Sequence, residues 1–218
     1  MIRQFLLFSI LLSFGFLPHT ATKGIEWEFK KEKSGIKVYT REGVDSNIKE
    51  LKITFSVEAK LNNIIALIND VEAFQNWVYR CSMSKNLKKI THFETYDYYR
   101  IDFPWPLSDR DMVGHTKLWQ DPETKVVTTT TVAKTEAADE VKNFVRISDH
   151  INKWVFTPTS PNTVDILYTL RSDPGGRIPS WMINMAIDQG PVQTMLRFRD
   201  MLKGGTYKDV QVDGIENF

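Results

Sequence analysis

The stretch that decides the fold runs from Asp173 to Gly205 and reads DPGGRIPSWMINMAIDQGPVQTMLRFRDMLKGG. It opens with the turn sequence Asp173–Gly176, and Pro179 follows where the first turn of a helix tolerates proline. The pattern from there to Leu202 predicts one helix about 35 Å long, which the pair Gly204–Gly205 ends.

The two halves of this helix differ in pattern. The first, Trp181–Ile187, is apolar on nearly every side, which predicts burial all round. The second, Val192–Leu202, is an ordinary amphipathic surface helix. Pro191 lies between them and cannot donate to the carbonyl of Ile187, so we expect a kink there. The first half is either plain core or one wall of an apolar cavity.

Composition limits the classes of protein. The chain has 218 residues, 42% of them hydrophobic, which suits one domain with a sizeable core. Arg3 lies in a segment that we interpret below as a cleaved signal peptide. Without it, the 28 basic residues become 27, which equals the 27 acidic residues, so the chain lacks the basic surplus of a nucleic-acid binder. Cys81 is the only cysteine, which excludes an intrachain disulfide. We interpret it as a small buried hydrophobic residue, with a nucleophile as the alternative.

Residues 1–22 predict a secretory signal peptide. Arg3 supplies the positive charge at the start of such a peptide. The apolar core Phe5–Leu17 follows and is short for a membrane span. Cleavage is expected near Ala21. The alternative is an uncleaved anchor. We therefore expect an exported protein, periplasmic or secreted. The predicted domain occupies residues 23–205, and the polar tail 206–218 is expected to fray.

Between these ends the chain alternates in the manner of antiparallel strands. In Ile48–Val57 apolar and polar residues alternate strictly, whereas Ala59–Asn69 and Val71–Trp77 show helical spacing. Pro158–Asn162 is expected to be a turn. The other strand-like runs are Trp27–Lys33, Ile36–Glu42, Cys81–Ile90, Phe93–Phe103, Asp109–Trp119, Val126–Thr135, Phe144–Ile151, Lys153–Thr157 and Val164–Arg171.

This order of elements predicts an α+β fold. A curved antiparallel sheet, with two short helices after its third strand, should wrap around the long C-terminal helix. A sheet of that size does not have to close tightly on one helix, so an apolar tunnel can remain between them.

Three motifs carry a resemblance to a known family. They are FPWPLSDRD at Phe103–Asp111, WVFTP at Trp154–Pro158 and DPGGRIPSW at Asp173–Trp181. Together with the element order they resemble the START family (steroidogenic-acute-regulatory-related lipid transfer) of the helix-grip superfamily, over roughly Trp27–Leu202. The absence of a substantial helix before the first strand, and the signal-like segment, resemble small bacterial envelope members.

The resemblance implies a helix-grip fold that binds, and can transfer, one lipid or other hydrophobic small molecule without shared catalytic residues. Transient contact with a membrane and a monomeric state are expected, and no cofactor is implied. The Pro104–Ser108 corner and the start of the last helix are candidate lids. The candidate cavity-wall residues are Tyr99, Ile101, Phe103, Met112, Tyr168, Met182, Met185, Ala186 and Gln189.

Charged residues near the first motif have two interpretations. For Arg110 and Asp111 we favour a structural role at the corner over contact with a ligand, because alternation sends the two side chains to opposite faces. If Tyr99 and its apolar neighbours line the tunnel, Arg100 is solvated. If the strand is inverted, Arg100 and Asp102 form a buried pair that could orient a ligand head group.

Other functions remain open as alternatives. The sequence has no histidine or cysteine pair at metal spacing, no nucleophile elbow and no phosphate-binding loop, so no metal site is predicted. A second hypothesis is a cyclase- or hydrolase-like enzyme on the same scaffold, using His115, Tyr168 or Asp102. A third is a domain with a filled interior that acts through its surface.

Overall fold

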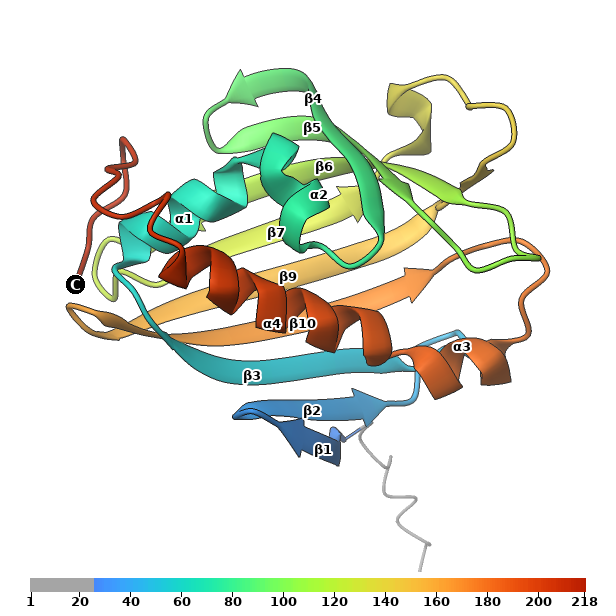
Figure 1. Cartoon of the computed structure of the whole chain (residues 1–218), viewed down its shortest axis with the longest axis horizontal. Helices are drawn as coiled ribbons and strands as arrows, with labels where there is room; N and C mark the ends of the chain where they lie inside the picture. Colours follow the sequence, from blue (N-terminus) through green and yellow to red (C-terminus); the bar gives the residue numbers. More distant parts are fainter. Residues whose placement is uncertain (1–25) are drawn as a thin grey trace, which may run out of the picture.

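The structure is a computed structural model that describes residues 26–218, so the expected signal segment 1–22 lies outside the described residues. Its main sheet has the order β1-β2-β3-β10-β9-β7-β6-β5-β4, in which every neighbouring pair is antiparallel, and the short β8 pairs with β6 in parallel (Figure 1). The strands are β1 (Glu28–Lys33), β2 (Ile36–Arg41), β3 (Glu50–Glu58), β4 (Cys81–Thr91), β5 (Glu94–Ile101), β6 (Arg110–Gln120), β7 (Val127–Ala133), β8 (Val145–Arg146), β9 (Asp149–Ser160) and β10 (Thr163–Asp173).

Helices α1, α2 and α4 lie together on the concave side of this sheet. Figure 1 shows α4 crossing the sheet, with α1 and α2 beside it. None of the helices within residues 26–218 has the length and apolar character needed to cross a bilayer. The helical elements are α1 (Leu61–Asn69), η1 (Val71–Ala73), α2 (Phe74–Trp77), η2 (Thr135–Ala137), α3 (Ser180–Ala186) and α4 (Gln189–Lys203). The predicted α+β helix-grip architecture is confirmed.

The core forms where α4 meets the sheet. Val192, Met195 and Phe198 recur at helical spacing and are buried. The ring of Phe198 lies 5.3 Å from that of Trp77 and 5.6 Å from that of Trp154. Edge-to-face and tilted aromatic contacts of this kind add to the free energy gained by burying apolar area. These rings fix the middle of α4 against α2 and the sheet.

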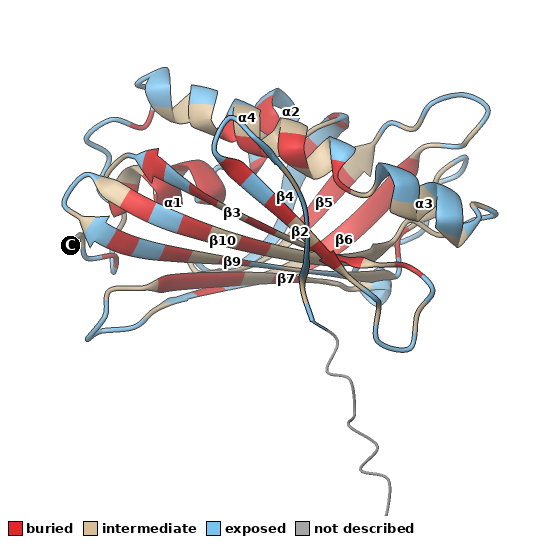
Figure 2. Cartoon of the chain, turned by 90° about the horizontal axis from the view of Figure 1, so that it is seen from below, coloured by how far each residue is buried: buried red, intermediate tan, exposed pale blue. Residues whose placement is uncertain are grey.

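The first half of the predicted helix differs from expectation. The helix is interrupted at Ile187–Asp188, one turn before Pro191, and α4 restarts so that this proline falls in its first turn. The expectation that Trp181–Ile187 is buried all round is wrong, because no residue of α3 is buried. Figure 2 shows α3 beyond the end of α4 with mostly exposed residues, where no further layer covers its outer side.

Two strand boundaries also differ. The run Phe144–Ile151 is not one strand, because it contains the short β8 and the start of β9. Strand β9 then continues from Asp149 through the run Lys153–Thr157 to Ser160. The turn expected from Pro158 begins later, after Ser160. Pro158 is tolerated within β9 because the pairing with β7 ends at Phe156, and the register to β10 shifts beside it.

The tail after Gly205 packs against the domain, so the expectation that it frays is wrong. Tyr207 and Ile215 are buried in the main core. Asn62 of α1 accepts a hydrogen bond from the backbone N–H of Val212 at 2.6 Å and donates to the carbonyl of Ile215 at 3.2 Å. These buried apolar and polar contacts hold the tail along α1.

The packing of the tail predicts the effect of truncating its side chains. Ile215→Ala should lower the free energy of unfolding by about 2 kcal/mol or more, since it removes a buried branched side chain. Val210→Ala, at a position that is 37% exposed, should cost less than about 0.5 kcal/mol. Urea denaturation of both variants checks this, and equally small losses would show that the tail contributes no core packing.

Candidate ligand-binding pocket

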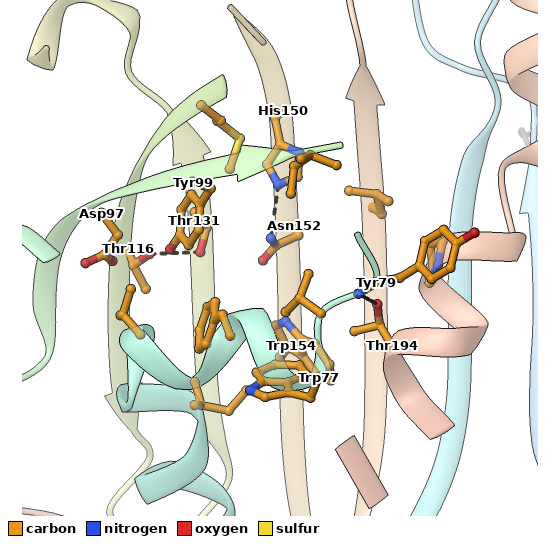
Figure 3. A pocket seen from close by; sticks show the side chains of 18 of the residues that line it. Trp77, Tyr79, Asp97, Tyr99, Thr116, Thr131, His150, Asn152, Trp154 and Thr194 are labelled. Atoms are coloured by element: carbon orange, nitrogen blue, oxygen red, sulfur yellow. Dashed lines mark hydrogen bonds between the residues drawn. The ribbon is translucent and has the colours of Figure 1, made fainter. Parts of the chain in front are cut away.

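A cavity of about 1250 Å³ lies between the helices and the concave face of the sheet (Figure 3). This volume exceeds the roughly 300–1,000 Å³ of ordinary small-molecule pockets. Its floor consists of inward-facing side chains of β5, β6, β7, β9 and β10, and its roof of α2, α3 and α4. The tail contributes a third side with Tyr207, Val210 and Val212. Exposed lining residues such as Met182 and Pro104 show that the pocket reaches the surface between α3 and the Pro104–Ser108 corner.

The structure brings most of the candidate wall residues together, although their contact with a ligand stays a prediction. Met185 is the exception, because its side chain is 65% exposed and does not line the pocket. On α3 the inward face is formed by Met182, Ile183 and Ala186, which leaves Met185 on the outer face. The candidates that line the pocket are Tyr99, Ile101, Phe103, Met112, Tyr168, Met182, Ala186 and Gln189.

The Arg110 guanidinium fixes the corner beside the pocket. It donates to the carbonyls of Pro174 and Gly175, each at 3.0 Å, and to that of Ser108. It thereby ties the loop before β6 to the turn after β10. The structural role expected for Arg110 is therefore confirmed.

Asp111 points to the opposite face of β6 from the pocket. Its two carboxylate oxygens accept hydrogen bonds from Nε and Nη2 of Arg146, both at 2.9 Å, and the pair is almost fully buried. The hydrogen bond to Asp111 raises the pKa of Arg146. Arg100 lies on the same outer face of the sheet and donates to the hydroxyl of Tyr98 at 3.2 Å. The inverted strand with a buried Arg100–Asp102 pair is thus excluded.

Several polar residues on the pocket floor were missing from the predicted site. The carboxylate of Asp97 is 1% exposed and accepts hydrogen bonds from Asn86 at 2.8 Å and Thr95 at 2.6 Å. Burial raises its pKa, although these hydrogen bonds oppose the shift. Asp97 lies two residues before Tyr99 and four before Ile101 on β5, so the three side chains point to the same face. Alternation alone could therefore have identified Asp97 as a pocket residue.

A second polar group lies on β9 and β10. His150 contacts the hydroxyl of Ser172 through Nδ1 at 3.0 Å and the amide nitrogen of Asn152 through Nε2 at 3.1 Å (Figure 3). An amide nitrogen can only donate, so Nε2 is the acceptor and Nδ1 carries the proton. Burial lowers the pKa of His150 to about 4, which keeps the ring neutral. Splitting β9 into two strands concealed that these residues share the face of Trp154.

The residues weighed for catalysis are not arranged for it. His115 faces away from the pocket, stacks on Tyr96 and contacts Glu94 at 2.8 Å. Tyr168 lines the pocket, but burial raises its pKa and keeps the phenol protonated. Asp102 lines the pocket only at its exposed rim, in the loop after β5. Cys81 is buried, which raises the pKa of its thiol, as expected for a packing residue.

Comparison with known proteins identifies the family. A model of the START domain matches residues 19–205. The chain belongs to the START family. A solved structure of a STAR-related lipid transfer protein from Xanthomonas axonopodis is 30% identical to this START domain, with a TM-score of 0.76, and the match covers 81% of this chain and 98% of that one.

Two further comparisons differ in how close the match is. Phosphatidylcholine transfer protein of Mus musculus is 26% identical to this START domain over 196 residues, which cover 86% of this chain and 87% of that protein. The Zhui aromatase/cyclase of a Streptomyces species matches with a TM-score of 0.51 at 10% identity, over 76% of this chain and 97% of that one. The second likeness shows the fold alone.

No group of three or more potential metal ligands occurs in residues 26–218.

The neutral His150 on the pocket floor predicts a pH dependence of stability. Its pKa is about 4 in the folded START domain and 6.5 ordinarily, so the unfolded chain binds more protons between these values. The free energy of unfolding should therefore fall as the pH decreases from 6.5 to about 4. Urea denaturation at several pH values should show a weaker decrease for His150→Gln. His92→Gln, which changes an exposed histidine, should behave as the wild type does; an unchanged slope in His150→Gln would contradict the assignment.

Proposed function

We propose that this protein binds one lipid or similar hydrophobic molecule in an internal tunnel formed by the pocket, and transfers it. The observation that carries the proposal is a cavity of about 1250 Å³ with aromatic and aliphatic side chains on both floor and roof. Each methylene group moved from water into such a site contributes about 0.8 kcal/mol. Membership of the START family, and the lipid-transfer names of its relatives, support the same function.

The enzymatic alternative has weaker support. General acid–base catalysis needs a titratable group that reaches the substrate with a suitable pKa. His150 is neutral, and both its ring nitrogens are engaged by Ser172 and Asn152. With Nδ1 protonated, the ring cannot accept the hydroxyl proton of Ser172, so the contact is not that of a serine nucleophile and its base.

Entry of the ligand is proposed to occur at α3. This helix has no buried residue, so it opens at lower cost than α4. Trp105 in the neighbouring corner is 93% exposed, and Trp181 and Met185 on α3 are 62% and 65% exposed. Tryptophan side chains suit the boundary between water and lipid. These side chains are proposed to make a transient contact with the membrane while a lipid enters or leaves.

Export to the periplasm or out of the cell and a monomeric state belong to the same proposal. The signal-like segment 1–22 supports export. Fractionation of the source cells with an antibody against the protein tests this location, and a cytoplasmic protein of full length would refute it. Sedimentation of the purified protein tests the monomeric state.

A matched pair of tryptophan substitutions on α3 tests the binding site. Ala186→Trp places a large side chain in the pocket and should reduce lipid loading about tenfold or more, which corresponds to 1.4 kcal/mol of lost binding. Met185→Trp, on the outer face of the same helix, should load normally. Native mass spectrometry after incubation with lipid vesicles measures both. Equal loading of the two variants would refute binding beneath α3.

The proposed membrane contact predicts a change in rate without a change in capacity. Trp105→Ala removes the most exposed of these aromatic side chains and should slow lipid transfer between vesicles several-fold. The amount of lipid bound at saturation should not change. A fluorescence assay of transfer between donor and acceptor vesicles tests this, and an unaltered rate would exclude Trp105 from the contact.

A further inference from the structure

A line of polar side chains crosses the floor of the pocket from β5 to β10. We call it the polar seam, and its members are Asp97, Thr116, Thr131, Asn152, His150 and Ser172. All six line the cavity, and Figure 3 shows most of them on adjacent strands. Apolar residues lie on either side of the seam, with Met112 and Ile147 toward α3, and Trp154 and Leu118 toward the tail.

Strand register makes the seam continuous. Thr116 is paired with Thr131 across β6 and β7, and their hydroxyl oxygens are 2.9 Å apart. Thr131 is in turn paired with Asn152 of β9. His150 then links Asn152 to Ser172 of β10. Polar groups in an apolar interior stabilise the fold only when they are hydrogen-bonded, so a seam in this position calls for a specific explanation.

The seam has unused hydrogen-bonding capacity. The side-chain oxygen of Asn152 is buried and has no partner in the described chain. Because Nδ1 of His150 donates to Ser172, the hydroxyl proton of Ser172 is free to donate elsewhere. If the Asn152 amide turns toward the cavity, its oxygen can accept from a ligand group that carries a hydrogen. The seam can thus both accept from a ligand and donate to it.

The charges around the pocket disfavour an anionic ligand group. Within the described residues, the pocket lining contains one arginine, Arg80, and one lysine, Lys89. Both are exposed at the rim of the pocket. Of the two ionisable members of the seam, His150 is neutral, and the buried carboxylate of Asp97 would repel a phosphate. Burying a phosphate without a paired cation is strongly unfavourable.

We propose that the polar seam binds one uncharged polar group of the ligand, a hydroxyl or an amide N–H, and that the ligand is therefore a neutral lipid rather than a phospholipid. This inference rests on the proposed function and specifies its ligand class. The hydroxyl or amide N–H of the ligand donates to the side-chain oxygen of Asn152. An ester or amide carbonyl of the ligand accepts from the hydroxyl of Ser172. The apolar chains extend along the floor on either side.

Four dioleoyl lipids that differ only in the head group test the inference. The purified full chain is incubated with dioleoylphosphatidylcholine vesicles that contain equal shares of dioleoylglycerol, its acetylated form and dioleoylphosphatidic acid. After gel filtration the bound lipid is extracted and quantified. Relative to the vesicle composition, dioleoylglycerol should be enriched about tenfold over each of the others, since a site built for a hydroxyl rejects the capped analogue.

Isosteric variants locate the preference. Asn152→Leu removes the proposed acceptor and should reduce the enrichment of dioleoylglycerol over its acetylated form about fivefold, the effect of one hydrogen bond, with total loading unchanged. Thr130→Val, at an outward-facing position on β7, should retain the enrichment. Thermal unfolding of each variant shows that it is folded.

The possible failures are distinguishable. Enrichment of phosphatidylcholine or phosphatidic acid, or equal uptake of the hydroxyl and acetylated forms, would overturn the inference and leave lipid binding intact. An Asn152→Leu variant that keeps the wild-type preference would also overturn it. A protein that takes up none of the four lipids would refute the proposed function itself.

Discussion

The C-terminal helix is too short to cover the concave face of a sheet in which nine strands lie side by side. The rest of the structure depends on this difference in size. Helix α4 has 15 residues and spans about 22 Å. Phe198 anchors it to Trp77 and Trp154 in the middle of the molecule. On either side of that contact the sheet continues beyond the reach of the helix, and a cavity of about 1250 Å³ remains.

The borders of the cavity are held with unequal strength. Arg110 ties two of the loops at one end, and the buried pair of Asp111 and Arg146 holds the strand from which it projects. At the joint between α3 and α4, the buried Asp188 binds Lys30 of β1 at 2.6 Å and also contacts Lys31. Helix α3 lies between these fixed points and has no buried residue. It is therefore the part of the cavity wall that moves away from the sheet at the lowest free-energy cost.

Much of this architecture could be predicted from the sequence because local patterns report burial directly. Alternation of apolar and polar residues identified β3 and β10, and helical spacing identified α1 and α4. The patterns failed where burial depends on distant elements. Helix α3 has the composition of a core helix, yet no other element within residues 26–218 covers its outer side (Figure 2). The polar tail packs because Asn62 offers its amide to the tail backbone, a partner that no local pattern reveals.

The same distinction applies to the pocket. Wall residues of β5 could be predicted by parity, including the interior orientation of Tyr99 and Ile101. Met185 was misplaced because an all-apolar helix does not show which of its faces turns inward. The polar seam could not be predicted, since it arises from register across β6, β7, β9 and β10 rather than from a motif in any one of them.

The most direct test of the central claim is a crystal structure of the protein purified from its own cells without removal of bound lipid. A lipid in the cavity should show electron density between α4 and the floor of the sheet, with its chains beside Met112 and Trp154 and its end beneath α3. An interior closed by side-chain movement, or a lipid bound only on the outer surface, would contradict the assignment of this cavity as the binding site.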